Sequence, residues 1–178
     1  MTASDGTEAM VDALRAAGPH PELADRLQLF GQFVGSWDLE RTSYAIDGTT
    51  ATVRGEWHFG WALEGRAIQD VWICPARGLR DEPIAPPGEW GTVLRFYDPR
   101  IDAWRATWIG PVSGVVHAFV ARQVGDEIVL SGATGEGDPL RWVFSDIRAD
   151  TFRWRSEVSL DTGSTWRLTV EMRVHRRS

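Results

Sequence analysis

The sequence contains no lysine, and all 19 of its basic residues are arginine. Chemistry that needs a lysine amine, such as Schiff-base formation or the attachment of pyridoxal phosphate, is therefore excluded. The net charge is −6, and no block of basic residues interrupts the chain. Because phosphate backbones are neutralised by clustered cations, we expect no nucleic-acid partner.

Cysteine is almost absent, since Cys74 stands alone. This excludes an intramolecular disulfide and a zinc site built from several cysteines, and no tight His/Glu spacing predicts another metal site. No apolar run approaches the ~20 residues of a membrane span, so we expect no membrane partner. The N-terminal stretch "MTASDGTEAM" lacks the apolar core of a signal peptide, and we predict a cytoplasmic protein.

Tryptophan, by contrast, is abundant. The chain has ten Trp in 178 residues, several times ordinary usage. Each Trp supplies a large rigid apolar surface with one N–H donor. A small filled core rarely needs so many, whereas a wide cavity or a ligand site can use them.

The hydrophobic pattern changes once along the chain. Residues 1–20 are predicted to be an N-terminal segment, partly disordered or forming a short helix over 7–18 that ends at Gly18. Residues 21–35 space apolar side chains at helical intervals and predict an amphipathic helix. After this helix the period becomes 2, and turn signals separate about ten strands. They are expected at approximately 36–45, 50–61, 66–74, 90–98, 103–110, 114–123, 127–132, 139–146, 151–159 and 164–175.

This order of elements predicts a mainly β domain over residues 21–178. A single closed antiparallel meander barrel with one or two N-terminal helices fits it best, because closure removes exposed sheet edges. A sandwich of two sheets is the alternative. The longest irregular stretch, residues 75–88, contains four prolines and is expected to form a loop at the rim of a cavity.

Three short motifs carry a resemblance to a known group. "GSW" (35–37) is similar to the Gly-x-Trp signature that opens the first strand in calycins, the group of lipocalins and fatty-acid-binding proteins. "WALEGRAIQD" (61–70) and "FYDPRIDAWRATWIG" (96–110) resemble motifs of an uncharacterised bacterial family of lipocalin-like domains of unknown function. The resemblance spans roughly residues 25–175. It implies a lipocalin-like barrel and brings no activity with it.

The nitrobindin-type haem barrels are related to this group, but their Gly-Thr-Trp-x-Gly opening is missing here. Asp38 and Leu39 follow Trp37 instead. His175 could ligate a haem, yet it lies close to the C-terminal end. We therefore expect no cofactor.

The stretch "RGEWHFGW" (54–61) alternates aromatic and charged residues, as other strands of the sequence do. Burial of an unpaired Arg is costly and burial of Trp is favourable, so the aromatic phase is predicted to face the interior. Glu56 and His58 are then expected on a solvated outer face rather than in a catalytic or metal site. A tight turn at Glu64 and Gly65 predicts that Trp57 lies opposite a second Trp on the next strand, Trp72.

If the aromatic phase lines the lumen, these side chains would contact a ligand: Trp57, Phe59, Trp72, Trp104, Trp108, Phe119, Trp142, Trp154 and Trp166. Four polar residues share that phase and are candidate catalytic groups: Asp70, Arg95, Tyr97 and His117. Arg41, Arg66 and Ser156 join them. The alternative is that Asp70 and Arg95 form a structural pair. Strands 66–74 and 90–98 are apolar in both phases, so the inner face is least certain there.

Three functions are consistent with this pattern. The first is the binding of a small, largely apolar or aromatic molecule in a Trp-lined lumen. The second is a cyclase, isomerase or lyase acting in the same lumen in natural-product metabolism, with acid/base groups such as Asp70 and His117. The third is an interaction module with a filled core that uses Trp90 and the 75–88 loop. Outward apolar residues on strands 66–74 and 114–123 leave room for a homodimer.

Overall fold

The computed structural model describes residues 3–79 and 88–177. Helix α1 (Ala3–Leu14) is followed by the 3-10 turn η1 (Pro21–Leu23) and helix α2 (Ala24–Gly31). A second 3-10 turn, η2 (Arg77–Leu79), follows the third strand. The strands are β1 (Gly35–Tyr44), β2 (Thr50–Ala62), β3 (Ala67–Cys74), β4 (Glu89–Asp98), β5 (Ala103–Gly110), β6 (Val115–Val124), β7 (Glu127–Ala133), β8 (Pro139–Ser145), β9 (Thr151–Val158) and β10 (Arg167–Arg176).

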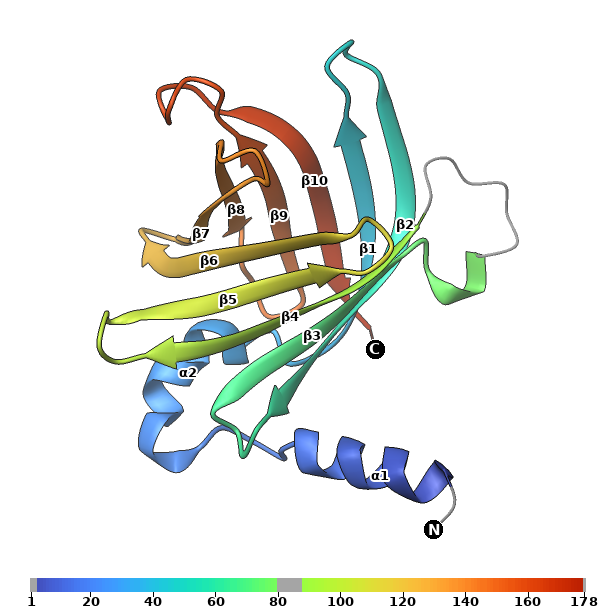
Figure 1. Ribbon diagram of the computed structural model, residues 1–178, viewed down its shortest axis with the longest axis vertical. Helices are drawn as coiled ribbons and strands as arrows, with labels where there is room; N and C mark the ends of the chain where they lie inside the picture. The colour runs from blue at the N-terminus through green and yellow to red at the C-terminus, as the bar shows by residue number, and fades with distance from the viewer. Residues whose placement is uncertain (1–2, 80–87, 178) are drawn as a thin grey trace.

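These strands close into one antiparallel barrel. Each strand pairs with its neighbour in sequence, and β1 pairs with β10 to complete the ring. In Figure 1, β4, β5 and β6 run across the view while β1, β2 and β10 rise steeply, so the two sides of the barrel cross at a steep angle. The predicted meander barrel is confirmed, and the sandwich alternative is wrong because no sheet edge remains open between β1 and β10.

The strand boundaries agree with the sequence expectation to within a few residues, whereas the first helix does not. Helix α1 begins at Ala3 and ends at Leu14, earlier than the predicted 7–18. The residues expected to form the last turn of this helix pair with the barrel instead. Arg15 forms a β-bridge with Ala62, and the N–H of Ala16 donates to the Trp61 carbonyl at 2.9 Å. Pairing with β2 therefore ended the helix. Part of the predicted 75–88 loop, residues 80–87, lies outside the described residues.

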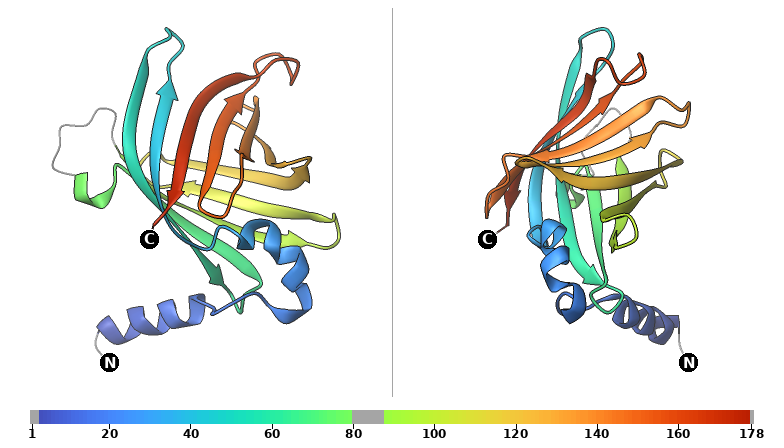
Figure 2. Two further views of the ribbon diagram at one scale, coloured as in Figure 1. Left: turned by 180° about the vertical axis from the view of Figure 1, so that it is seen from behind. Right: turned by 90° about the vertical axis from the view of Figure 1, so that its left-hand side faces the viewer.

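Helix α2 closes one end of the barrel (Figures 1 and 2). Leu27, Phe30 and Phe33 point inward and are almost completely buried. The ring of Phe30 packs edge-on against Trp104 at 4.9 Å. The Trp37 indole N–H donates to the Phe33 carbonyl at 2.7 Å and ties the segment after the helix to β1. The helical spacing of apolar residues in this segment thus supplies a hydrophobic plug.

The β2–β3 hairpin has the register expected from its turn. Trp57 pairs with Trp72, and the Arg66 N–H donates to the Leu63 carbonyl at 3.0 Å. Gly65 has a φ of +75°, a left-handed conformation that glycine adopts without steric cost. The pairing places both indoles on the inner face, as predicted from the alternation.

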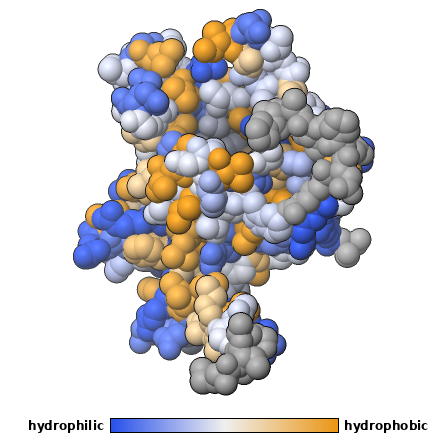
Figure 3. Space-filling view, turned by 45° about the vertical axis from the view of Figure 1, so that its right-hand side comes forward, coloured by the Kyte–Doolittle hydropathy of each residue, from blue (hydrophilic) through white to orange (hydrophobic). Residues whose placement is uncertain are grey.

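The outside of the barrel carries some apolar surface. Figure 3 shows hydrophobic side chains gathered in a band on one face, between hydrophilic regions. Phe96, Ile109 and Val116, on β4, β5 and β6, are each more than two-fifths exposed. A homodimer through such a surface stays a prediction. Within the described residues, neither helix has the length and apolar character needed to span a membrane.

Candidate functional site

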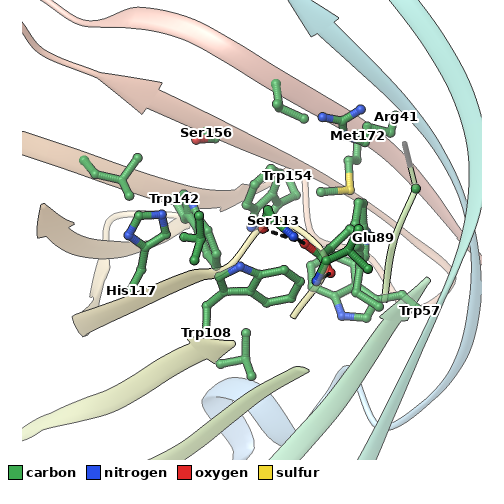
Figure 4. A pocket seen from close by; sticks show the side chains of 17 residues that line it. Arg41, Trp57, Glu89, Trp108, Ser113, His117, Trp142, Trp154, Ser156 and Met172 are labelled. Carbon is green, nitrogen blue, oxygen red and sulfur yellow. Dashed lines mark hydrogen bonds between the residues drawn. The ribbon is translucent and has the colours of Figure 1, made fainter. Parts of the chain in front are cut away.

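The barrel encloses a cavity of about 480 Å³ on the side of Trp57 away from α2 (Figure 4). Its wall combines residues from the strands with residues from the β3–β4 and β5–β6 connections. The lining residues are Arg41, Trp57, Trp72, Gly88, Glu89, Val93, Trp108, Val112, Ser113, Val115, His117, Leu140, Trp142, Trp154, Ser156, Val170 and Met172. The interior is therefore divided into an aromatic plug at the helix end and an open chamber beyond it.

Five of the predicted ligand-binding tryptophans lie in this wall and contact one another. The ring centroids of Trp72 and Trp108 are 6.0 Å apart, and those of Trp108 and Trp142 are 5.9 Å apart. Trp154 continues the series at 5.2 Å from Trp142 and 6.4 Å from Trp57. All four contacts are edge-to-face, which is a favourable arrangement of aromatic quadrupoles. The indoles thus form a continuous and mutually supported apolar surface.

A glycine makes room for one of these indoles. Gly91 lies opposite Trp72 in the β3–β4 pairing. A Cβ atom at this position would stand 2.1 Å from the ring of Trp108. The absence of a side chain at Gly91 therefore leaves room for the Trp108 ring to pack against β4 and form its part of the wall.

Glu89 is an acidic group of the wall, and its carboxylate is already fully used. It accepts N–H bonds from Val112 at 3.0 Å, from Ser113 at 2.9 Å and from Trp90 at 3.0 Å. The Ser113 hydroxyl donates to it at 2.6 Å (Figure 4). Burial alone would raise the pKa of Glu89, but these hydrogen bonds outweigh it and hold the pKa below its usual range. Glu89 is an anion that fixes the 111–114 turn over the cavity.

His117 is the one predicted catalytic residue that lines the cavity. It lies opposite Trp108 on β6, with its ring 6.2 Å from that of Trp142. Burial lowers the pKa of His117, although the Ala133 carbonyl favours the charged form. The imidazole is therefore neutral at pH 7 and can accept or donate a hydrogen bond inside the chamber.

Asp70 and Arg95 meet, but the structure places them outside the cavity lining. They form an ion pair in which both side chains are almost completely inaccessible to solvent. The guanidinium lies between the rings of Phe30 and Phe59, 4.9 and 5.3 Å from their centres. Burial raises the pKa of Asp70, and the charge of Arg95 opposes that rise. The pair therefore lies among the aromatic side chains that pack between α2 and the barrel at its closed end.

The remaining predicted residues also lie outside the cavity lining. The hydroxyl of Tyr97 donates to Asp102 at the helix end of the barrel. Phe59 packs against the plug, and Trp104 packs against Phe30. The ring centroid of Phe119 lies 4.5 Å from that of Trp142, so Phe119 packs against that indole.

Trp166 does not share the inner phase that the sequence suggested. Its ring instead lies 4.1 Å from the guanidinium of Arg141, which pairs with Glu157 on the outer face. The cause is a bulge in β10 between Leu168 and Val170, which shifts the register against β9. An extra residue in one strand reverses the alternation on either side of it, and this bulge carries no clear signal in the sequence.

Glu56 and His58 do face outward, but the expectation of a solvated pair is wrong for Glu56, which is 2% exposed. The η2 turn and the C-terminal residues cover it. Arg77 donates to its carboxylate through the backbone N–H and Nε at 2.9 and 2.8 Å, and Arg177 donates at 3.1 Å. Hydrogen bonds from Arg77 hold the pKa of Glu56 well below its usual range. The cluster ties two chain segments to the barrel and has a structural role.

Some cavity residues were not found from the sequence. Glu89, Val112 and Ser113 come from a strand end and a turn, where alternation gives no information about direction. No group of three or more His, Cys, Asp or Glu side chains capable of holding a metal occurs within residues 3–79 and 88–177. His175 is exposed on the outer side of β10, opposite Asp38, and does not face the lumen.

No protein-family model and no curated protein matches the sequence. Among solved structures, the chain is similar to Rv2717c from M. tuberculosis, with a TM-score of 0.61 and 15% identity over 90% of this chain and 99% of that one. It is also similar to the S-type phycobiliprotein lyase CPES from Guillardia theta, with a TM-score of 0.55 and 14% identity over 85% and 92%. The fold is that of a lipocalin-like β-barrel. At such identities the likeness concerns the fold alone.

Proposed function

We propose that this protein binds a small, largely apolar or aromatic molecule in the tryptophan-lined cavity. The observation that carries the proposal is the cavity itself, about 480 Å³ with five indoles in its wall. Protein interiors are close-packed and contain few voids larger than a water molecule. A volume of this size equals that of roughly 16 waters at ~30 Å³ each. It lies within the range of small-molecule sites, where an apolar wall supplies affinity and a few polar groups fix orientation.

Native mass spectrometry of the protein purified from a rich host tests this proposal. A retained ligand would give ions heavier than the 19.9 kDa chain, and their fragmentation would begin to identify it. Titration of candidate molecules should quench Trp fluorescence, because five indoles surround the bound molecule. A chain that carries no ligand and shows no Trp quenching with any apolar or aromatic compound would contradict the proposal.

A barrel-lumen enzyme of the cyclase, isomerase or lyase type is the second candidate. One observation favours it: the neutral imidazole of His117 faces the chamber and could transfer a proton to or from a bound molecule. Asp70 is buried beneath the chamber, so a role for it in turnover would have to be indirect. Once a ligand is identified, conversion of that ligand by the wild type and its loss in His117→Gln, with ligand affinity kept, would support catalysis.

A further inference from the structure

The polar groups in the cavity wall differ in how much of their hydrogen-bonding capacity is occupied by the protein's own residues. Glu89 offers acceptor oxygens, but four donors from its own chain already occupy them. Arg41 is different: within residues 3–79 and 88–177 its guanidinium makes neither an ion pair nor a hydrogen bond. Arg41 therefore brings a cation with five N–H donors and no partner among the described residues to the chamber.

The position of Arg41 follows from the strand alternation. It shares the inner phase of β1 with Trp37 and Leu39, and its neighbours across the sheet are Val53 and Met172. It is half-buried at the wall of an apolar chamber. A guanidinium there has lost part of its hydration and gains no charged partner from the described chain, so it is available to an anionic ligand.

Further hydrogen-bond donors in the same wall are unused. The Ser156 side chain is 8% exposed and makes no hydrogen bond through its hydroxyl in the described part of the chain. The buried indole N–H groups of Trp57 and Trp72 likewise have no hydrogen-bond partner among the described residues. In Figure 4, Arg41 and Ser156 lie on one side of the chamber, whereas Trp57 and Trp108 lie on the other. Arg41 and Ser156 thus face the indoles of Trp57 and Trp108 across the chamber.

We propose that the ligand is an amphipathic anion, an inference that rests on the proposed function. Its apolar or aromatic body lies against the indoles, and its carboxylate or similar oxyanion is bound by the guanidinium of Arg41. A planar guanidinium matches a carboxylate with two parallel N–H···O bonds, and charge-assisted bonds of this kind are stronger than neutral ones. Ser156 lies on β9, two strands across and two residues along from Arg41, roughly 12 Å away. It can donate to a second oxygen of the same ligand.

A pair of fluorescent probes that differ in charge tests the assignment. 1-Anilinonaphthalene-8-sulfonate is an anion, and N-phenyl-1-naphthylamine is the same aromatic amine without the sulfonate. We expect the wild type to bind both and Arg41→Met to weaken binding of the sulfonate about tenfold or more. Binding of the neutral probe should change less than about twofold. Arg41→Lys keeps the charge but not the fork geometry, and it should fall between the wild type and Arg41→Met.

Arg54→Met is the matched control. Arg54 lies on β2 with its side chain exposed on the outer face, so its removal changes the net charge equally without touching the chamber. Far-UV circular dichroism and thermal midpoints check that each variant is folded. If Arg41→Met does not fold, the comparison of the two probes is made with Arg41→Lys instead.

Three results would overturn the inference, and they separate it from the proposed function. If both probes bind and Arg41→Met affects them equally, Arg41 does not recognise an anion, although the cavity still binds apolar molecules. If Arg54→Met weakens sulfonate binding as much as Arg41→Met does, the effect comes from net charge rather than from contact. If neither probe binds the wild type with a defined stoichiometry, the chamber does not accept an aromatic body of this size and this inference is overturned; the proposed function is then judged by native mass spectrometry and by quenching with smaller apolar compounds.

Discussion

Replacement of Asp70 by Asn should destabilise the protein strongly while leaving the cavity in place. Asp70 and Arg95 are 0% and 1% exposed, and the Nε and Nη1 atoms of Arg95 have no hydrogen-bond partner among the described residues. The Asp70 carboxylate is therefore the group that compensates the buried charge. Its removal leaves a guanidinium held only between Phe30 and Phe59.

The magnitude follows from the burial of the pair. Removal of one partner of a buried ion pair typically costs about 3–5 kcal/mol. That is a large share of the roughly 5–15 kcal/mol by which a domain is stable. With a urea m-value of about 2 kcal/mol/M, the midpoint of unfolding should fall by roughly 2 M. Trp fluorescence reports the transition, because the indoles leave a buried environment on unfolding.

The double variant Asp70→Asn/Arg95→Met is the informative companion. It removes both charges, so that no buried charge is left without its partner, and the amide at position 70 keeps the Val93 N–H as a hydrogen-bond donor. We expect it to regain most of the lost unfolding free energy, so that the double-mutant cycle gives a large coupling between the two residues. Both variants should bind N-phenyl-1-naphthylamine within about twofold of the wild type below their unfolding transitions, since neither residue lines the chamber. A fully stable Asp70→Asn variant that no longer binds the probe would refute this reasoning and restore Asp70 as a ligand-contacting group.

The other predictions concern the wall and the outer cluster. Gly91→Ala should cost about 1–3 kcal/mol in unfolding free energy and weaken probe binding, because the new methyl group displaces Trp108 into the chamber; unchanged probe binding would contradict this. Glu56→Gln should cost about 2 kcal/mol at pH 7 through its lost bonds to Arg77. Since the folded-state pKa is lowered, this stability is present above the unfolded pKa of about 4.3 and is lost progressively as the pH falls toward the folded-state pKa, so the difference between wild type and variant in urea titrations should shrink steadily below about pH 4. Burial raises the pKa of Cys74 to about 11, so its thiol should react with Ellman's reagent at pH 8 only at the rate of unfolding, and fast labelling of the folded protein would argue against that burial.

The sequence alone was sufficient for the architecture. The change of period after residue 35, the turn signals and the cost of burying arginine predicted a closed barrel with its aromatic phase inside. They also predicted the Trp57–Trp72 pairing, because a strand side chain has only two directions and a tight turn sets the register. Those rules are local, so they can be read from neighbouring residues.

The tertiary structure decided the features that the alternation of side chains along a strand does not reveal. An inward side chain can enter the plug or the chamber, and that depends on its height along the barrel relative to α2. Asp70 and Arg95 lie in the plug, whereas Arg41 and His117 reach the chamber. Trp166 was turned outward by a bulge in β10 that no turn signal marks. Sequence pattern fixes which face a residue occupies, but depth and register shifts arise from packing between distant segments, and those decided which groups are available to a ligand.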